Sequence, residues 1–240
     1  MAELFNDDFE DTTLDAWGTP VEEGSNTVVN SATAAIVGSR GMLLTFDGSS
    51  DELHILSDTW TPVDEAWAGI HFRIPAGFTL PAFGDAILVG LHCAGFPTNA
   101  ASYTVQLQNF TGSAAFPDEF EITYGSTTNR YSVSLSADTD YWLTFHALSH
   151  ASTGGFEVLL DGVEVMSDFT TDTSTYDDID AFYIGPNSGS EPPNASTIWV
   201  DSVIADDTTY PTEPTDGGGN APTAALQGPL WGPLAGPIGD

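Results

Sequence analysis

Apolar and polar residues alternate with a period of two along much of the chain. In YTVQLQNF the apolar residues Tyr103, Val105 and Leu107 are separated by polar ones, and FEITYG and YSVSLS repeat the pattern. Such segments predict strands with one buried and one solvated face, which is typical of antiparallel sheets. The segment FEVLLDGVEVM predicts a hairpin, because Asp161 and Gly162 suit a two-residue turn that requires positive φ at both positions.

About a dozen such strand candidates follow one another, separated by clusters of Gly, Asn, Asp, Ser and Pro, and no long segment has helical periodicity. This spacing predicts an all-β fold, an antiparallel two-sheet jelly-roll sandwich. Near Tyr210 the composition changes, and PTEPTDGGGNAPT contains little that could be buried. We therefore expect a sandwich over residues 1–209, a Pro/Gly-rich linker over 210–224 and an apolar tail over 225–240.

The tail contains GPLWGPLAGPIG, in which Gly-Pro-apolar recurs every four residues. Proline fixes φ and lacks a donor, so the segment predicts an extended ribbon rather than a helix or a central strand. Its apolar side chains would form an adhesive patch if exposed, so we expect them to dock in the groove of a partner. Folding back onto the chain's own sandwich and disorder are the alternatives. The predicted docking residues are Leu230, Trp231, Leu234 and Ile238.

The charge of the chain is extreme. Thirty-five acidic residues and three arginines, with no lysine, give a formal net charge of -32. Nucleic-acid binding is excluded, because phosphate contacts need Lys and Arg, and anionic membrane surfaces are disfavoured for the same reason. The acidity indicates solubility in a salty medium, repulsion between neighbours in an assembly, or bound calcium.

Three stretches resemble a known superfamily. LFNDDFEDTTLDAW, YWLTFHALSHASTGGFEVLLDGVEVM and IDAFYIGPNSGSEPPNASTIWVDSVIAD together are similar to concanavalin A-like lectin/glucanase sandwiches of the laminin-G-like sort, in order and spacing across residues 4–206. The resemblance implies a sandwich whose first and last strands meet. The superfamily contains glycan binders, glycanases, lyases, adhesion modules and virus surface proteins, so the resemblance leaves the function open.

Some members of the superfamily hold a structural calcium where the first and last strands meet. The matching positions are Asp8, the carbonyl of Gly48 and Asp201. Carboxylate and carbonyl oxygens are the ligands that calcium prefers, so a structural Ca²⁺ is expected there. The alternative is that the two carboxylates are solvated or hydrogen-bonded at strand ends.

Catalytic motifs are not apparent. Glycanases of this fold resemble one another in an acidic motif along one strand, and the nearest pattern here is the pair Glu119 and Glu121. His92 and Cys93 are adjacent, so on a strand they point to opposite faces and cannot act together. Lyase sites of this fold need basic residues to neutralise uronates, which this composition scarcely offers. We therefore expect no enzyme activity and no catalytic residues.

Exposed aromatic rings could bind sugars. Trp60 and Trp67 flank the segment TPVDEA and are the candidates for a sugar-stacking platform, with core packing as the alternative.

The N-terminal residues lack the pattern of a secretory signal, and no run approaches the roughly 20 apolar residues of a membrane span. We predict a non-enzymatic structural protein, made in the cytoplasm and displayed on the surface of a virion, as a decoration or fibre-like protein of a phage. Its tail would anchor it to capsid or sister subunits, in a homo-oligomer or a larger assembly. A glycan-binding lectin-like module is the alternative, and a glycanase comes third.

Overall fold

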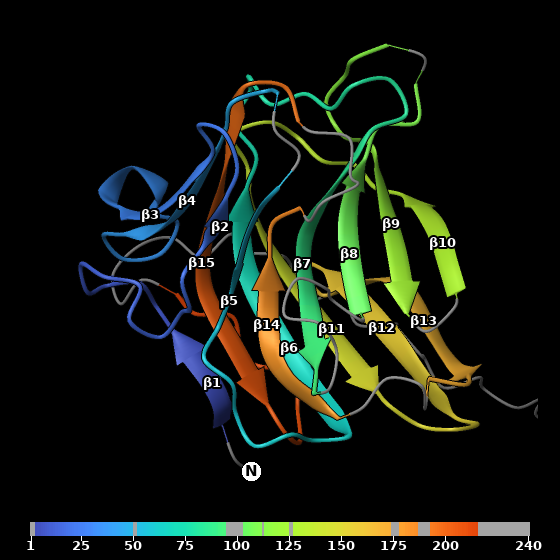
Figure 1. The fold of residues 1–240 in the computed structure, drawn as a ribbon. Coiled ribbons are helices and arrows are strands. Elements are labelled where there is room, and N and C mark those ends of the chain that lie inside the picture. The colour runs from blue at the N-terminus through green and yellow to red at the C-terminus, as the bar shows by residue number, and fades with distance from the viewer. Residues whose placement is uncertain are drawn as a thin grey trace, which may run out of the picture.

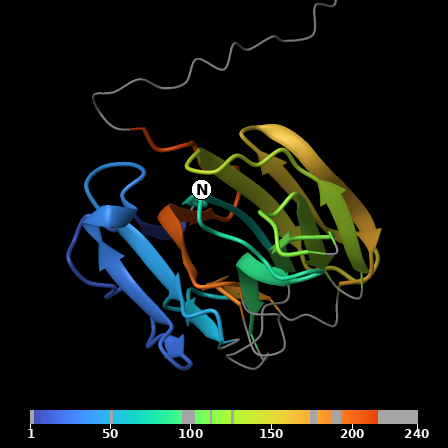
Figure 2. The same ribbon diagram turned by 90° about the horizontal axis from the view of Figure 1, so that it is seen from above.

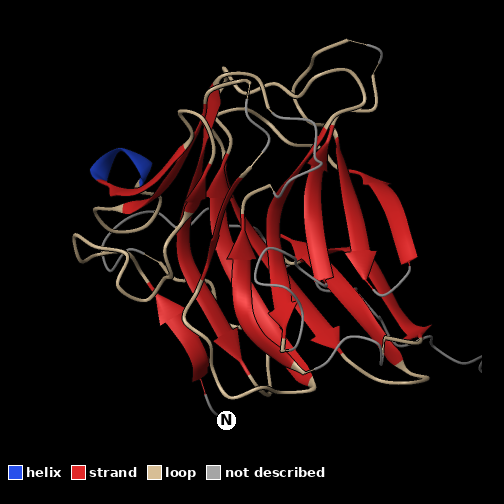
Figure 3. Cartoon of the chain, viewed as in Figure 1, coloured by secondary structure: helices blue, strands red, loops and turns tan. Residues whose placement is uncertain are grey.

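The computed structural model describes residues 3–49, 52–94, 103–111, 113–124, 127–173, 178–186 and 193–215. Within these ranges the chain forms two antiparallel β-sheets and one short 3₁₀ helix, η1 (Ala32–Ala34). The sheets lie one behind the other, as Figures 1 and 3 show. The predicted all-β sandwich is confirmed.

The front sheet is the one nearer the viewer in Figure 1. In spatial order it contains β10 (Thr127–Ser132), β9 (Glu119–Tyr124), β8 (Tyr103–Gln108), β7 (Asp85–Cys93), β14 (Ile179–Ile184), β5 (Leu53–Leu56) and β2 (Val21–Glu22).

The back sheet contains, in spatial order, β13 (Val163–Thr171), β12 (Gly154–Leu160), β11 (Asp140–Leu148), β6 (Glu65–Arg73), β15 (Ser196–Asp206), β4 (Gly41–Phe46) and β3 (Thr27–Ser31), with β1 (Glu3–Asp7) beside β15. The first and last strands therefore meet, as the resemblance implies, and Phe5 pairs with Ala205. The predicted hairpin joins β12 to β13, with φ of 50° at Asp161 and 73° at Gly162.

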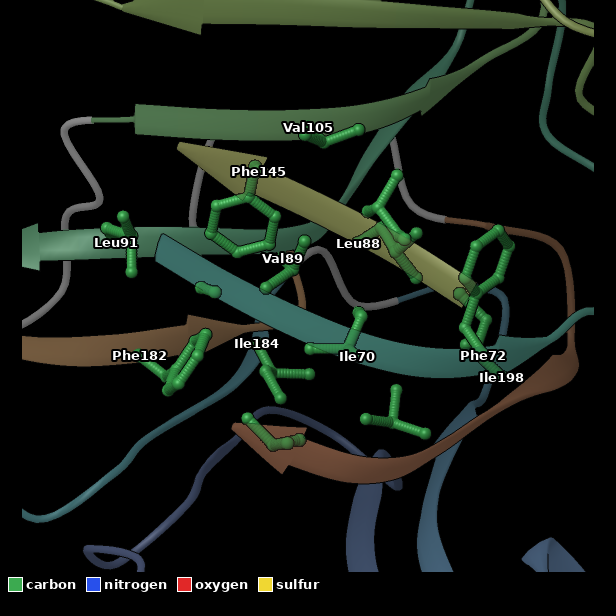
Figure 4. Close-up of a cluster of buried hydrophobic side chains, with 14 of the residues drawn as sticks. Ile70, Phe72, Leu88, Val89, Leu91, Val105, Phe145, Phe182, Ile184 and Ile198 are labelled. Atoms are coloured by element: carbon green, nitrogen blue, oxygen red, sulfur yellow. The ribbon is translucent and has the colours of Figure 1, made fainter. Parts of the chain in front are cut away.

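The core fills the space between the sheets. Figure 4 shows Ile70, Phe72 and Phe145 of the back sheet together with Val89 and Phe182 of the front sheet, and all five are fully buried. This packing follows from the alternation, since every second residue of each strand points to the opposite sheet.

The alternation predicts a solvated outer face for the front sheet, and here the structure differs. All residues of β14 are buried, and in β8 only Gln106 is not. Polar side chains that point away from the core, such as Thr104 and Gln108, are 4% and 2% exposed. The outer face of the central front strands is thus a second buried region, and it is polar.

The contacts of the sandwich extend beyond the predicted boundary at residue 209. The Tyr210 hydroxyl donates a hydrogen bond to Glu157 of β12. Glu213 Oε1 lies 3.2 Å from His71 Nε2 of β6. Residues 210–215 of the predicted linker therefore follow the back sheet, as the red segment in Figure 2 shows. In the described part of the chain, no helix is long and apolar enough to span a membrane.

Candidate functional site

The outer face of the front sheet carries a cluster of polar and aromatic side chains. Their neighbours along each strand point into the core, which fixes the cluster on the opposite side. We call this set the outer cluster; it consists of His54 of β5, His92 of β7, Thr104 and Gln106 of β8, and Asp180 and Tyr183 of β14.

Strand register brings the cluster together. Tyr183 pairs with Gly90 of β7, and Gly90 pairs with Thr104 of β8. His92 pairs with Ala181, so it is a diagonal neighbour of Tyr183, and diagonal neighbours lie about 7–8 Å apart.

Tyr183 and His54 form a buried pair with unsatisfied polar atoms. Their rings stack with centroids 4.9 Å apart and an interplanar angle of 18°, and they are 0% and 1% exposed. Within the described residues, neither the Tyr183 hydroxyl nor His54 Nδ1 has a hydrogen-bond partner. Buried polar atoms in proteins are nearly always paired, so these two call for a ligand or another explanation.

Burial also sets the protonation states of this pair. It raises the pKa of the Tyr183 phenol well above its usual range and lowers the pKa of His54 to about 4. At neutral pH the phenol therefore keeps its proton and the imidazole is neutral. The phenol of Tyr183 can therefore donate a proton or a hydrogen bond, and the neutral imidazole of His54 can accept one.

His92 and Asp180 form the second pair of the cluster. His92 Nδ1 lies 2.7 Å from Asp180 Oδ1, and both side chains are largely buried. A carboxylate hydrogen-bonded to one ring nitrogen fixes the orientation of the imidazole, which is the arrangement of an oriented general base. Beside it, Gln106 Nε2 donates to Thr104 Oγ1 at 3.3 Å, so the floor of the face also offers amide and hydroxyl groups.

The buried His54 predicts a loss of stability in acid. The unfolded chain binds a proton at His54 below about pH 6.5 and the folded chain only below about pH 4, so the free energy of unfolding from this group falls as the pH drops through that window. In His54→Phe, which keeps a ring against Tyr183, this fall should disappear. Denaturant unfolding at several pH values gives the free energy of unfolding as a function of pH. If this free energy falls equally steeply in the variant and in the unaltered protein, the prediction is refuted.

The structure does not bring the three predicted calcium ligands together. Gly48 lies against Ala195, just before β15 begins, whereas Asp201 lies six residues further along, which is about 20 Å of strand. Asp8 is exposed and follows β1 near Ser202. Within the described ranges, no group of three or more His, Cys, Asp or Glu side chains is placed to hold a metal ion.

Asp201 has a structural environment instead. It is fully buried, and its two carboxylate oxygens accept the backbone N–H groups of Ile36, Val37 and Ser202 at 2.8, 2.8 and 2.7 Å. Burial raises the pKa of Asp201 to about 7, against the effect of these three donors. The carboxylate therefore ties β15 to the loop that precedes β4.

The two predicted sugar-stacking residues lie apart. Trp60 packs against the core beside Phe182 and donates from Nε1 to the Ile179 carbonyl. Trp67 lies on the outer face of the back sheet, stacked on His146 with ring centroids 4.3 Å apart. They do not form one platform, and sugar binding by either remains a prediction.

The acidic pair of β9 forms an ion pair with β10. Glu119 and Glu121 lie on one face of β9, and Glu121 is paired with Arg130 at 2.8 Å. The predicted docking residues of the tail fall outside the described residues.

Two hollows lie elsewhere on the molecule. One of about 620 Å³ is lined by Asp8, Glu10 and Ser202 among others, and one of about 440 Å³ lies between β10 and β13. Among the described residues that line them, none has an unpartnered buried polar atom, which distinguishes both hollows from the outer cluster.

Comparison with known proteins defines the fold. No family model and no curated protein matches the chain. Among solved structures, it is similar to an endo-β-1,4-glucuronan lyase from the fungus Trichoderma reesei, with a TM-score of 0.62, 16% identity, and coverage of 86% of this chain and 96% of the other.

Two further solved structures have a similar fold. The cellulose-induced protein Cip1 matches with a TM-score of 0.59 and 13% identity over 85% of this chain and 97% of its own. The alginate lyase Aly36B matches with a TM-score of 0.52 and 13% identity over 78% and 88%. At such identities the likeness establishes the fold alone, an antiparallel two-sheet β-sandwich.

These similarities overturn two predictions from the sequence. We expected a non-enzymatic virion protein and no enzyme activity, but the solved chains with this fold include a glucuronan lyase and an alginate lyase.

The outer cluster was not predicted from the sequence. The signal that could have revealed it is a polar or phenolic residue at an outward position inside an apolar strand, as in AILVGLHC and IDAFYI.

Proposed function

We propose that the protein is a glycan-processing enzyme that cleaves an acidic polysaccharide by elimination, with the outer cluster as its active site. The observation that carries this proposal is the fully buried Tyr183 hydroxyl, which has no partner among the described residues and lies against a neutral His54. Solved enzymes of the same fold that are named for lyase activity on uronate polymers support the choice of reaction.

Elimination from a uronate needs three functions. A base takes the proton from the carbon next to the carboxylate, an acid protonates the departing glycosidic oxygen, and hydrogen-bond donors stabilise the charge that builds up on the carboxylate. The C–H and glycosidic C–O bonds break, and a C=C bond forms in the sugar ring. No water is consumed in this step.

The outer cluster offers a residue for each function. His92, oriented by Asp180, is the proposed base. Tyr183 is the proposed acid, since its raised pKa keeps the phenolic proton in place. Gln106 lies on the same face and supplies an amide donor for the carboxylate. The proton gained by His92 and the one lost by Tyr183 are restored through solvent after each turnover.

The scarcity of basic residues does not exclude this chemistry. Amide and imidazole donors can stabilise a carboxylate without Lys or Arg, because hydrogen bonds to a charged acceptor are the strong ones. A site built from imidazole, phenol and amide groups therefore needs neither Lys nor Arg to hold a uronate.

The test is incubation with glucuronan, with alginate and with a neutral glucan, followed by ultraviolet absorbance of the newly formed unsaturated sugar ends. The proposal expects absorbance to rise with at least one of the two uronate polymers and not with the neutral glucan. An unchanged absorbance with both uronate polymers, at protein concentrations where unfolding curves show an intact fold, would contradict it.

The net charge of -32 predicts an unusual salt dependence. An acidic enzyme and an acidic polymer repel each other, and screening shortens the range of this repulsion from about 30 Å at 0.01 M salt to about 8 Å at 0.15 M. The KM for the polymer should therefore fall as salt is added, with kcat little changed. Steady-state kinetics over this range measures it, and a KM that rises with salt would show that local attraction dominates.

A further inference from the structure

Two phenylalanines are exposed at one end of the front sheet. Phe83 and Phe110 are 59% and 51% exposed, and their rings meet edge to face with centroids 5.7 Å apart. Phe83 precedes β7 and Phe110 follows β8, so both lie on the loops at the top of the view in Figure 1. Exposed apolar side chains that lie together, unlike ones scattered singly, can mark a binding surface.

A buried asparagine holds these two loops together. Asn109 is fully buried, and its amide nitrogen donates to the carbonyls of Leu80, Pro81 and Ser113 at 2.8–3.1 Å. Its side-chain oxygen accepts from the backbone N–H of Thr111 at 2.9 Å. The ring pair is therefore presented on a fixed support, and binding would cost little ordering entropy.

The backbone at Phe83 is strained. Its φ is 58°, in the left-handed region that bulky residues rarely adopt. Strain of this kind persists where the surroundings enforce it, and it gathers at functional sites. Here the Phe83 N–H donates to the Thr111 carbonyl and the Gly84 carbonyl accepts from Asn109, which fixes the turn.

A positive charge lies beside the ring pair. The Arg130 guanidinium is 4.7 Å from the centroid of the Phe110 ring, and its Nε donates to Glu121 at 2.8 Å. The chain has only three Lys or Arg residues, and the other two, Arg40 and Arg73, belong to the back-sheet side. The single cation of the front sheet is thus placed over an exposed aromatic ring, where an anionic sugar could meet both.

The patch lies on the same face of the front sheet as the outer cluster. Thr104, Gln106 and Gln108 of β8 project to this face over about 13 Å of strand. Phe110 follows two residues after Gln108, under the Arg130 guanidinium. We infer that Phe83, Phe110 and Arg130 form a distal sugar-stacking subsite for an acidic polysaccharide whose chain runs along β8 to the outer cluster. The inference rests on the proposed function for the identity of that polymer.

The test is affinity electrophoresis of the full chain in gels that contain sodium alginate, glucuronan or a neutral glucan. Phe83→Ala and Phe110→Ala should each raise the dissociation constant for a uronate polymer, obtained from the retardation, about tenfold. Arg130→Gln should raise it for the uronate polymers and leave any retardation by the neutral glucan unchanged. Val29→Ala is the matched control, since Val29 is 43% exposed and lies on β3, at the opposite edge of the back sheet from β13 and away from the patch. Thermal unfolding confirms that each variant is folded.

Retardation lost in the two phenylalanine variants and kept in the control supports the subsite. Equal retardation of all variants, or none of the unaltered protein by either uronate polymer, overturns it. Turnover measured in parallel separates the two proposals. Unsaturated products with unchanged KM in the variants would overturn the subsite and leave the activity, whereas phenylalanine-dependent binding without products would overturn the activity and leave the subsite.

Discussion

Replacing Tyr183 with Phe should lower the turnover of a uronate polymer by about 100-fold or more and leave the free energy of unfolding unchanged or slightly higher. A positioned acid contributes typically 10²–10⁴-fold to rate, and the phenolic oxygen is the proposed proton donor. The same hydroxyl is fully buried and unpartnered within the described part of the chain, so its removal relieves a desolvation cost.

Kinetics and denaturant unfolding of the same preparations check this prediction. Tyr103→Phe is the matched control, because Tyr103 is also a fully buried tyrosine of the front sheet but belongs to the core side of β8. It should keep its turnover. Full activity in Tyr183→Phe would remove this residue from the reaction.

Replacing Asp201 with Ala should destabilise the fold by about 3 kcal/mol or more, because three buried backbone donors lose their acceptor and each unsatisfied donor costs about 1–3 kcal/mol. Natural domains have a total stability of only about 5–15 kcal/mol. Asp201→Asn should cost less, since its carbonyl oxygen can still accept from Ile36 and Val37 and only the Ser202 N–H faces an amide donor.

The measurement is urea unfolding, with Asp8→Ala as a control. Asp8 is exposed and accepts a hydrogen bond from the backbone N–H of Glu10 at 3.1 Å, so its loss should cost less than about 1 kcal/mol. An Asp201→Ala protein as stable as the control would mean that the carboxylate does not support the loop before β4.

The fold was predictable because its signals are local. Tyr103, Val105 and Leu107 alternate with polar residues, and this alternation alone places them in the core. The turn at Asp161 and Gly162 also needs only two adjacent residues with positive φ. Such features require no knowledge of which strand lies next to which.

The outer cluster was not predictable because it depends on strand order. His54, His92 and Tyr183 come from strands that are far apart in sequence, and only the order β8-β7-β14-β5 makes them neighbours. The alternation also suggested that outward positions would be solvated, whereas His54 and Tyr183 are buried. A stacked and buried pair of this kind has no signature in either segment alone.

The prediction of a non-enzymatic protein failed for a related reason. It was drawn from missing motifs and missing lysines, which exclude particular solutions but not a site made of imidazole, phenol and amide groups. His92 was judged in isolation, because its partner Asp180 lies 88 residues away in the sequence.

The most direct test of the proposed chemistry is mass spectrometry of the products formed from glucuronan and alginate in water enriched with heavy oxygen. Elimination consumes no water, so the account predicts shortened chains with an unsaturated end and no heavy oxygen beyond what reducing oligosaccharides of the same polymer take up by exchange in the same water. Shortened chains that carry one heavy oxygen each would identify hydrolysis, and unshortened polymers would mean that the outer cluster does not cleave uronates; either result would contradict the account.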